Sequence, residues 1–172
     1  WSGGNSIILT NGLIGSGSDI TNITVGGYAA QIGAQGSNWV EITLGAGSTN
    51  GGTADIVIQS TSQSESTFAN AYTYNPTPVI TSFYPTNAPI SGGSKITIRG
   101  TNLGSGTDVT NVTLAGVVVD SIGEQSATQV VVTVAAHSAV TGEVVVTSTS
   151  FGISTNVSEF TYVEPAISGI TP

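Results

Sequence analysis

The chain has 172 residues, of which ten are Asp or Glu and two are Lys or Arg, so its formal net charge is -8; it has one His and no Cys or Met. Two basic residues cannot neutralise the phosphates of a nucleic-acid duplex, and a chain without Cys holds neither a disulfide nor a Cys-based metal site. No apolar run approaches the roughly 20 residues of a membrane-spanning helix, so we expect no nucleic-acid partner and no membrane insertion in this segment.

The composition favours strands over helices. Val, Ile and Thr are abundant, Gly, Ser and Asn interrupt the chain at short intervals, and only 7% of the residues are charged. Branched side chains of this kind suit the pleated, half-buried surface of a β-sheet. The composition therefore predicts an all-β protein.

An internal repeat indicates two domains. Residues 3–27 align with residues 92–116 without a gap, and 11 of these 25 positions are identical. Residues 40–44, 55–62 and 72–74 also have counterparts, at 130–134, 143–150 and 160–162. The charge divides evenly, because residues 1–76 hold four acidic and no basic side chains while residues 77–172 hold six acidic and two basic ones. The pattern indicates a tandem duplication of a unit of nearly 90 residues.

Each unit is predicted to be a small sandwich of short strands. In the second unit we expect strands near 78–84, 94–100, 108–114, 116–122, 128–134, 142–149 and 156–162. Ile96 and Ile98 alternate with polar residues and are expected to face the core, as are residues 42, 44, 130, 132 and 134. The alternation is less regular over residues 109–114, which indicates a β-bulge.

The order of turns and strands in the second unit carries a family resemblance. A Pro-Val-Ile segment at 78–80 is followed by Pro85, by Ser-Gly-Gly at 91–93 and by a strand that leads into Gly-Thr-Asn-Leu-Gly at 100–104. The first unit has the double glycine at 3–4 and a looser version of the last motif at 11–15. These features resemble the IPT/TIG family of immunoglobulin-like domains. The resemblance implies two tandem early-type Ig-like β-sandwich domains of a cell-surface or extracellular repeat protein.

The two ends of the chain interrupt the repeat. Residues 1–76 are expected to form an IPT/TIG-like domain that lacks its first strand, residues 77–163 a complete one, and residues 164–172 the orphan first strand of a following domain. The orphan strand repeats the pattern of residues 78–85, and the residues expected to add to another sheet are Pro165, Ala166, Ile167, Ser168, Gly169 and Ile170. An excerpt from a longer covalent array, head-to-tail strand exchange between copies, and an artefact of where the chain was cut all fit this pattern.

Three positions match the sequon for N-glycosylation. They are Asn22, Asn111 and Asn156, and the first two occupy the same position of the repeat. A three-residue motif also occurs by chance, so these residues are equally interpreted as polar positions on exposed strands. In a secreted protein the sequons predict glycans on the polar faces of the sheets.

Few other residues could carry chemistry. Asp19 and Asp108 follow Gly-Ser-Gly turns and are interpreted as turn or strand caps, because calcium requires several carboxylates in one loop. His137 stands in a loop, and its counterpart is Gly47, so it is a weak catalytic candidate. Trp39 has Gln129 as its counterpart, which indicates a surface or partner-contact position in the first unit alone. No catalytic, metal or cofactor site is predicted.

The sequence predicts a structural role outside the cell. We expect a module of a linear array of Ig-like domains, as in a stalk, adhesin or filament, with neighbouring repeats or copies of the chain as partners. The alternative is a receptor or carbohydrate-binding accessory module that contacts glycans. An enzyme has no support beyond one histidine.

Overall fold

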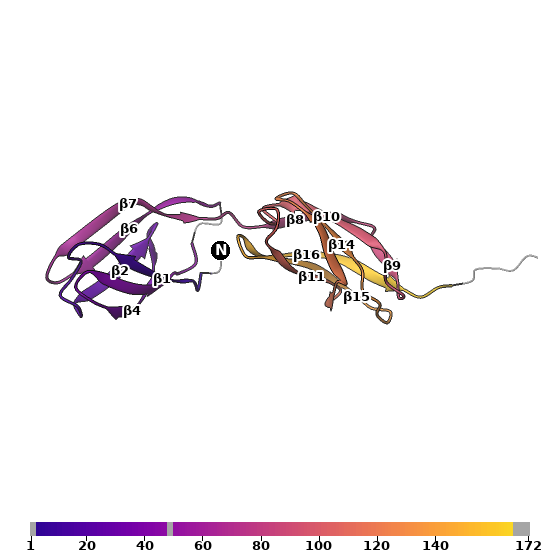
Figure 1. The fold of residues 1–172 in the computed structure, drawn as a ribbon, viewed down its shortest axis with the longest axis horizontal. Helices are drawn as coiled ribbons and strands as arrows, with labels where there is room; N and C mark the ends of the chain where they lie inside the picture. Colours follow the sequence, from indigo (N-terminus) through magenta and orange to yellow (C-terminus); the bar gives the residue numbers. More distant parts are fainter. Residues whose placement is uncertain (1–2, 48–49, 167–172) are drawn as a thin grey trace, which may run out of the picture. The chain divides into compact units, whose positions relative to one another are not determined.

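The computed structural model describes residues 3–47 and 50–166, and the chain separates into two units, Trp1–Pro76 and Thr77–Pro172. All regular structure in the described residues is β-strand, and each unit is built from two sheets (Figure 1). The prediction of an all-β fold with two tandem β-sandwiches is confirmed.

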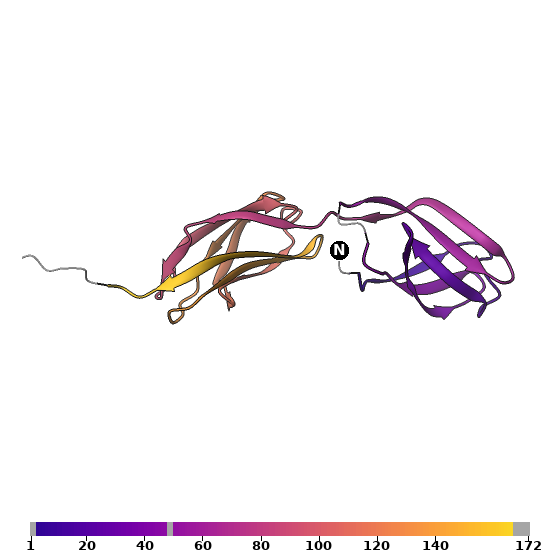
Figure 2. The ribbon, with the colours of Figure 1, turned by 180° about the vertical axis from the view of Figure 1, so that it is seen from behind.

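Unit 2 (Thr77–Pro172) consists of a four-stranded and a five-stranded sheet. The strand orders are β13-β14-β10-β8 and β12-β11-β15-β16-β9. Neighbouring strands pair antiparallel, except that β9 pairs in parallel with the end of β16. The strands are β8 (Val79–Tyr84), β9 (Asn87–Pro89), β10 (Lys95–Thr101), β11 (Val109–Leu114), β12 (Val117–Val118), β13 (Ser121–Gln125), β14 (Gln129–Thr133), β15 (Thr141–Ser148) and β16 (Gly152–Val163). Figure 2 shows β16, in yellow, running from one end of the unit to the other.

Unit 1 repeats this plan with fewer strands. Its sheets have the orders β1-β5-β4 and β3-β2-β6-β7. The strands are β1 (Ser6–Thr10), β2 (Ile20–Val25), β3 (Tyr28–Ala29), β4 (Gln31–Gln35), β5 (Trp39–Thr43), β6 (Gly52–Ser60) and β7 (Ser64–Tyr74). By position in the repeat, β1 corresponds to β10, β6 to β15 and β7 to β16. Among the described residues of unit 1, no strand corresponds to β8 or β9.

The alternating apolar positions form a separate core in each unit. Ile96 and Ile98 of β10 have no exposed surface, as predicted, and Val130, Val132 and Val134 join them in the core of unit 2. Ile42 and Leu44 are buried in the core of unit 1. Burial of such side chains is the main stabilising term of a small sandwich.

The repeated double glycine has a steric cause. Gly3 and Gly92 have φ values of 72° and 70°, a region that side chains other than glycine rarely adopt. An added Cβ would lie 2.6 Å from the backbone of residue 45 in unit 1 and of residue 136 in unit 2. The next residue in each unit, Gly4 or Gly93, donates its N–H to the carbonyl of Leu44 or Val134. The motif therefore fixes how the chain enters β1 and β10.

Two details of the predicted strands were wrong. The single strand expected at 116–122 is divided into β12 and β13, which lie in different sheets. The chain changes sheets at Val119 and Asp120, whose N–H groups bond to Val112 and Thr133 respectively. The short strand β9 was not expected, because Pro85 and Pro89 obscure its pattern. The bulge expected near residue 109 is present, between Val109 and Asn111.

Candidate functional site

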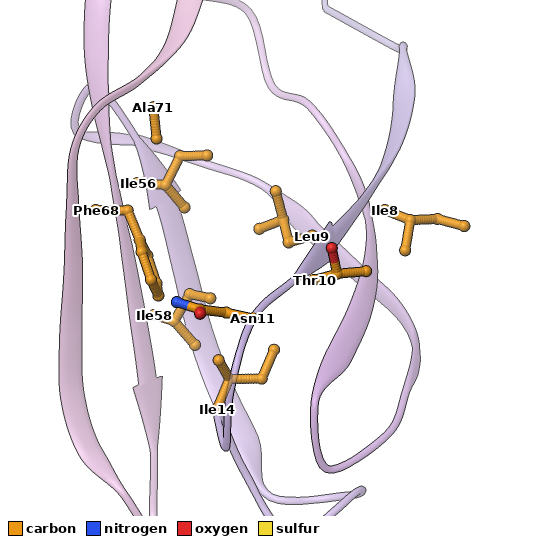
Figure 3. A pocket seen from close by; sticks show the side chains of 9 residues that line it. All are labelled: Ile8, Leu9, Thr10, Asn11, Ile14, Ile56, Ile58, Phe68 and Ala71. Atoms are coloured by element: carbon orange, nitrogen blue, oxygen red, sulfur yellow. The ribbon is translucent and has the colours of Figure 1, made fainter.

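An apolar groove runs along the free edge of β1 in unit 1 (Figure 3). Its volume is about 280 Å³, against about 30 Å³ for one water in the liquid. Leu9, Ile56 and Phe68 point toward one another across it, whereas Ile8 points away. The lining residues are Ile8, Leu9, Thr10, Asn11, Ile14, Ile56, Ile58, Phe68 and Ala71, and none of them is charged.

The corresponding place in unit 2 is occupied by β8. That strand pairs with β10, and Ile98 faces Phe83 while Gly100 faces Ile80. The residues of β10 that pair with β8, 97 to 101, correspond in the repeat to residues 8 to 12. The groove of unit 1 is thus the space that an equivalent of β8 would fill.

Core-facing side chains of β1 are more exposed than their counterparts in β10. Ile96 and Ile98 of β10, which has β8 beside it, are fully buried, but their counterparts Ile7 and Leu9 are only half-buried. Ile8 is 64% exposed, a large value for an isoleucine in a strand. An open sheet edge with apolar side chains is a template for pairing with another strand.

A polar clamp on β8 also differs between the units. In unit 2 the Ile80 N–H donates to Ser154 Oγ at 2.9 Å, and Asn156 Nδ2 donates to the Ile80 carbonyl at 3.0 Å. In unit 1 the serine is kept as Ser66, but Phe68 stands in the place of the asparagine. Phe68 makes the groove more apolar than the site in unit 2.

Asp19 and Asp108 each hold two loops together. Asp19 accepts from the N–H groups of Ser16 and Ser62 at 2.6 and 2.8 Å, and Asp108 accepts from those of Ser105 and Ser150. Hydrogen bonding, from Ser62 above all, lowers the pKa of Asp19 well below its ordinary range. Desolvation raises the pKa of Asp108, but the hydrogen bonds from Ser150 and Ser105 outweigh it, so this pKa is also lowered. Both carboxylates act as caps within the turn.

No group of three metal-ligating side chains occurs in the described part of the chain. His137 is exposed, its Nδ1 lies 3.0 Å from the Ser138 carbonyl oxygen, and its ring lies 5.7 Å from that of Tyr162. Nothing in this arrangement resembles a nucleophile with its base.

The three sequon asparagines lie on strands. Asn22 on β2 is exposed and donates to Gln59 Oε1 at 3.2 Å, and Asn111 on β11 is half-buried. Asn156 on β16 uses the atom that would carry a glycan, Nδ2, in its bond to Ile80. Asn22 Nδ2 is also the donor in its bond to Gln59, so the two residues differ in exposure: Asn22 is exposed and Asn156 is half-buried.

Trp39 begins β5 and is 37% exposed. Its indole lies against Gly36, where an added Cβ would meet the ring nitrogen at a distance of 2.3 Å. The Gly36 N–H donates to the Trp39 carbonyl, which closes this turn. Trp39 is therefore a partly exposed aromatic residue of unit 1.

The predicted strand-addition residues lie at the end of the described chain. Pro165 and Ala166 follow β16, are exposed and belong to no strand. Ile167, Ser168, Gly169 and Ile170 lie outside the described residues. The structure therefore describes only the first two of the six residues predicted to add to another sheet.

Sequence analysis missed two structural roles. Gln35 and Gln125 each accept the N–H of the first residue of a strand, Ile20 or Val109, at 2.9 and 2.8 Å. The glutamine recurs at equivalent positions of the two units, and this recurrence is the sequence signal that could have indicated its role. The second missed role is that of Asn156, whose partner Ile80 is 76 positions away in the sequence.

Comparison with known families gives one match. Residues 78–162 match the IPT/TIG domain family. No curated protein matches the chain. Across the described residues, the structure contains no helix long and apolar enough to cross a membrane.

The solved structures that resemble this chain include an extracellular region and a surface glycan-binding protein. The Plexin A4 extracellular region has a TM-score of 0.48 at 16% identity, covering 95% of this chain and 15% of its own. SGBP-B of the Bacteroides ovatus mixed-linkage glucan utilization locus, solved with a mixed-linkage heptasaccharide, has a TM-score of 0.39 at 19% identity, covering 96% and 42%. A surface glycan-binding protein from Prevotella bryantii has a TM-score of 0.36 at 14% identity, covering 91% and 36%. The chain spans less than half the length of each.

Proposed function

We propose, starting from the fact that residues 78–162 are an IPT/TIG domain, that the chain is a structural segment of an extracellular or cell-surface protein. In this proposal Ig-like units follow one another in a linear array. Residues 77–163 are a complete unit, residues 1–76 are an IPT/TIG-like unit without its first strand, and residues 164–172 are the first strand of a further unit.

The path of the chain through unit 2 carries the proposal. Val79, at the start of β8, lies opposite Thr101 at the end of β10. Val163, at the end of β16, accepts from the N–H of Ile90, just before β10 begins. The seven residues of β10 span about 20 Å from Thr101 to Lys95, and Ile90 precedes Lys95 by five residues. A unit that receives and releases the chain at opposite ends adds length when it is repeated, as a spacer must.

The surface chemistry supports a location outside the cell. The chain has few charges and many Ser and Thr, and the exposed Asn22 and its counterpart Asn111 are proposed glycan positions. Glycans there would cover polar sheet faces and discourage lateral association. The roles of Asp19, Asp108 and His137 described above support a non-catalytic module.

Electron microscopy of the native full-length protein tests this function. A spacer array appears as thin beaded rods whose length grows with the number of units. A compact, monodisperse globule would contradict the proposal. Small-angle scattering of the 172-residue chain provides the matching measurement in solution, with an elongated particle expected.

A second candidate is a receptor or carbohydrate-binding accessory module, supported by Trp39. Trp39 is 37% exposed, and the C–H faces of sugars pack on exposed aromatic side chains. A glycan array probed with the chain and with the Trp39→Ala variant tests this role. Binding that the variant loses supports it, and no binding by the parent chain contradicts it.

A further inference from the structure

We infer that the groove along β1 is the docking site for residues 165–172 of a second copy of this chain, which add beside β1 in the position that β8 takes beside β10. This inference rests on the proposed function, a linear array of units. It adds which chain supplies the strand and which residues of the two strands pair.

The segment has the pattern that the groove requires. Aligned on β8, Ile167 takes the place of Ile80 and Ile170 that of Phe83, the two buried side chains of that strand. Pro165 and Pro172 take the places of Pro78 and Pro85, which bracket β8. Residues 165–172 carry no charged side chain, and neither do the groove residues, so the pairing desolvates no charge.

The pairing in unit 2 fixes the expected register. Transfer of the β10–β8 pairs places Ile170 opposite Leu9, Gly169 opposite Thr10 and Ile167 opposite Asn11. In unit 2 the Thr81 hydroxyl donates to the Arg99 carbonyl, and Ser168 is placed to make the same bond to Thr10. The added strand would bury Leu9 as β8 buries Ile98.

The length of the segment favours a second copy over the same chain. Eight residues form the strand, so only Glu164 remains to connect it to the end of β16 at Val163. One residue spans at most about 3.6 Å, whereas the chain enters unit 2 beside Thr101, at the far end of a seven-residue strand that spans about 20 Å. Because the segment starts within one residue of the end of β16, the inference assigns it to the groove of a second copy.

Cross-linking in the cysteine-free chain tests the inference. A Thr10→Cys/Gly169→Cys variant places two thiols on directly opposite residues, whose Cα atoms are about 4.5–5.5 Å apart in an antiparallel pair. Mild oxidation is expected to give a ladder of covalent multimers on a non-reducing gel. The off-register variant Thr10→Cys/Glu164→Cys is expected to remain mostly monomeric.

Two donor variants serve as matched controls on the in-register cysteine pair. Ile167→Asp/Ile170→Asp places charges at the buried positions and is expected to abolish the ladder. Thr171→Asp places a charge at an outward position, corresponding to Tyr84, which is 77% exposed, and is expected to keep the ladder. Because these residues follow β16, the folding of both units can be checked independently by their amide spectra.

Three results would overturn the inference. They are the absence of cross-links in folded protein, equal cross-linking of the off-register pair, and cross-links only within one chain. Exclusively intramolecular cross-links in the full-length parent would likewise assign the groove to another part of the same polypeptide. Each of these leaves the spacer function standing, because beaded rods can be built from covalently joined units.

Discussion

Asn156 on β16 donates its side-chain Nδ2 hydrogen to the carbonyl oxygen of Ile80 on β8, at a distance of 3.0 Å. The Ile80 N–H donates in turn to Ser154 Oγ, two residues before Asn156. The two bonds join the first and last long strands of unit 2 and satisfy both backbone groups of Ile80, which is buried. In unit 1 the corresponding strand positions are present as Ser66 and Phe68, but no described residue occupies the place of Ile80.

Replacement of Asn156 by Ala should destabilise unit 2. The Ile80 carbonyl would lose its partner within a buried region, at a cost of about 1–3 kcal/mol in the free energy of unfolding. Asn22→Ala removes an exposed sequon asparagine and should change the stability by no more than about 0.5 kcal/mol. Residue-resolved hydrogen exchange distinguishes the two units. Equal, negligible effects of both variants would show that the Asn156 bond contributes nothing.

Truncation of equivalent side chains in β1 and β10 is expected to lower the free energy of unfolding by unequal amounts. Ile98→Ala removes a fully buried side chain and should cost about 2–5 kcal/mol. Leu9→Ala, at the equivalent position of unit 1, should cost clearly less in dilute protein, because Leu9 is half-buried beside an open groove. Urea denaturation followed by amide spectra of each unit measures both values. Equal costs would mean that unit 1 is closed in solution.

Asp19 and Asp108 predict a loss of stability in acid. Their pKa values are lowered in the folded chain from an ordinary value of 3.8, so their contribution is fully present above about pH 4 and is lost as the pH falls through the folded pKa. Asp19→Asn and Asp108→Asn should therefore be less stable than the parent at pH 7 and should show a flatter dependence below pH 4. Thermal melts from pH 2 to 7 provide the measurement.

Glu159→Gln, which removes an exposed charge on β16, is the control for net charge in this series. Its melting temperature at pH 7 should lie close to that of the parent. If the two aspartate variants matched this control at every pH, the hydrogen bonds to the serine N–H groups would not be stabilising.

Substitution of Gly36 is expected to change the environment of the Trp39 indole. A methyl group at Gly36 would overlap the indole, so Gly36→Ala should displace the ring and shift its fluorescence emission. A Trp1→Phe background leaves Trp39 as the single emitter. Gly12→Ala, where an added Cβ meets nothing within 4 Å, is the matched control and should leave the emission unchanged. An unshifted spectrum for Gly36→Ala would contradict the observed contact.

The sequence was sufficient wherever a local pattern determines the structure. The alternation of Ile96 and Ile98 identified the core face of β10, and the repeat placed the two sandwiches. It was insufficient at Val119, where the chain passes from one sheet to the other, because apolar residues occur on both sides of the crossing and no proline or glycine stands between Val118 and Ile122. The tertiary partner of the Asn156 amide lies on a strand 76 positions earlier, so the sequon pattern gave no sign of its hydrogen bond to Ile80.

The candidate groove was only partly predictable. Alignment of the repeat indicated that residues 1–76 have no equivalent of β8, and hence an open edge. The volume of the groove and the contribution of Phe68 depend on how β1, β6 and β7 pack, which the repeat alone does not specify. Phe68 stands where unit 2 has Asn156, and the structure shows that Asn156 bonds to β8 whereas Phe68 lines the groove.

Hydrogen exchange at β1 as a function of chain concentration tests the central claim most directly. The informative amides are those among residues 8–11 that do not pair with β5, with the amides of residues 97–100 in β10 as the internal reference. The account predicts fast exchange at high dilution, protection that rises with concentration, and no such rise in the Ile167→Asp/Ile170→Asp variant. Full protection of these amides in the dilute monomer, or fast exchange at every concentration, would contradict it.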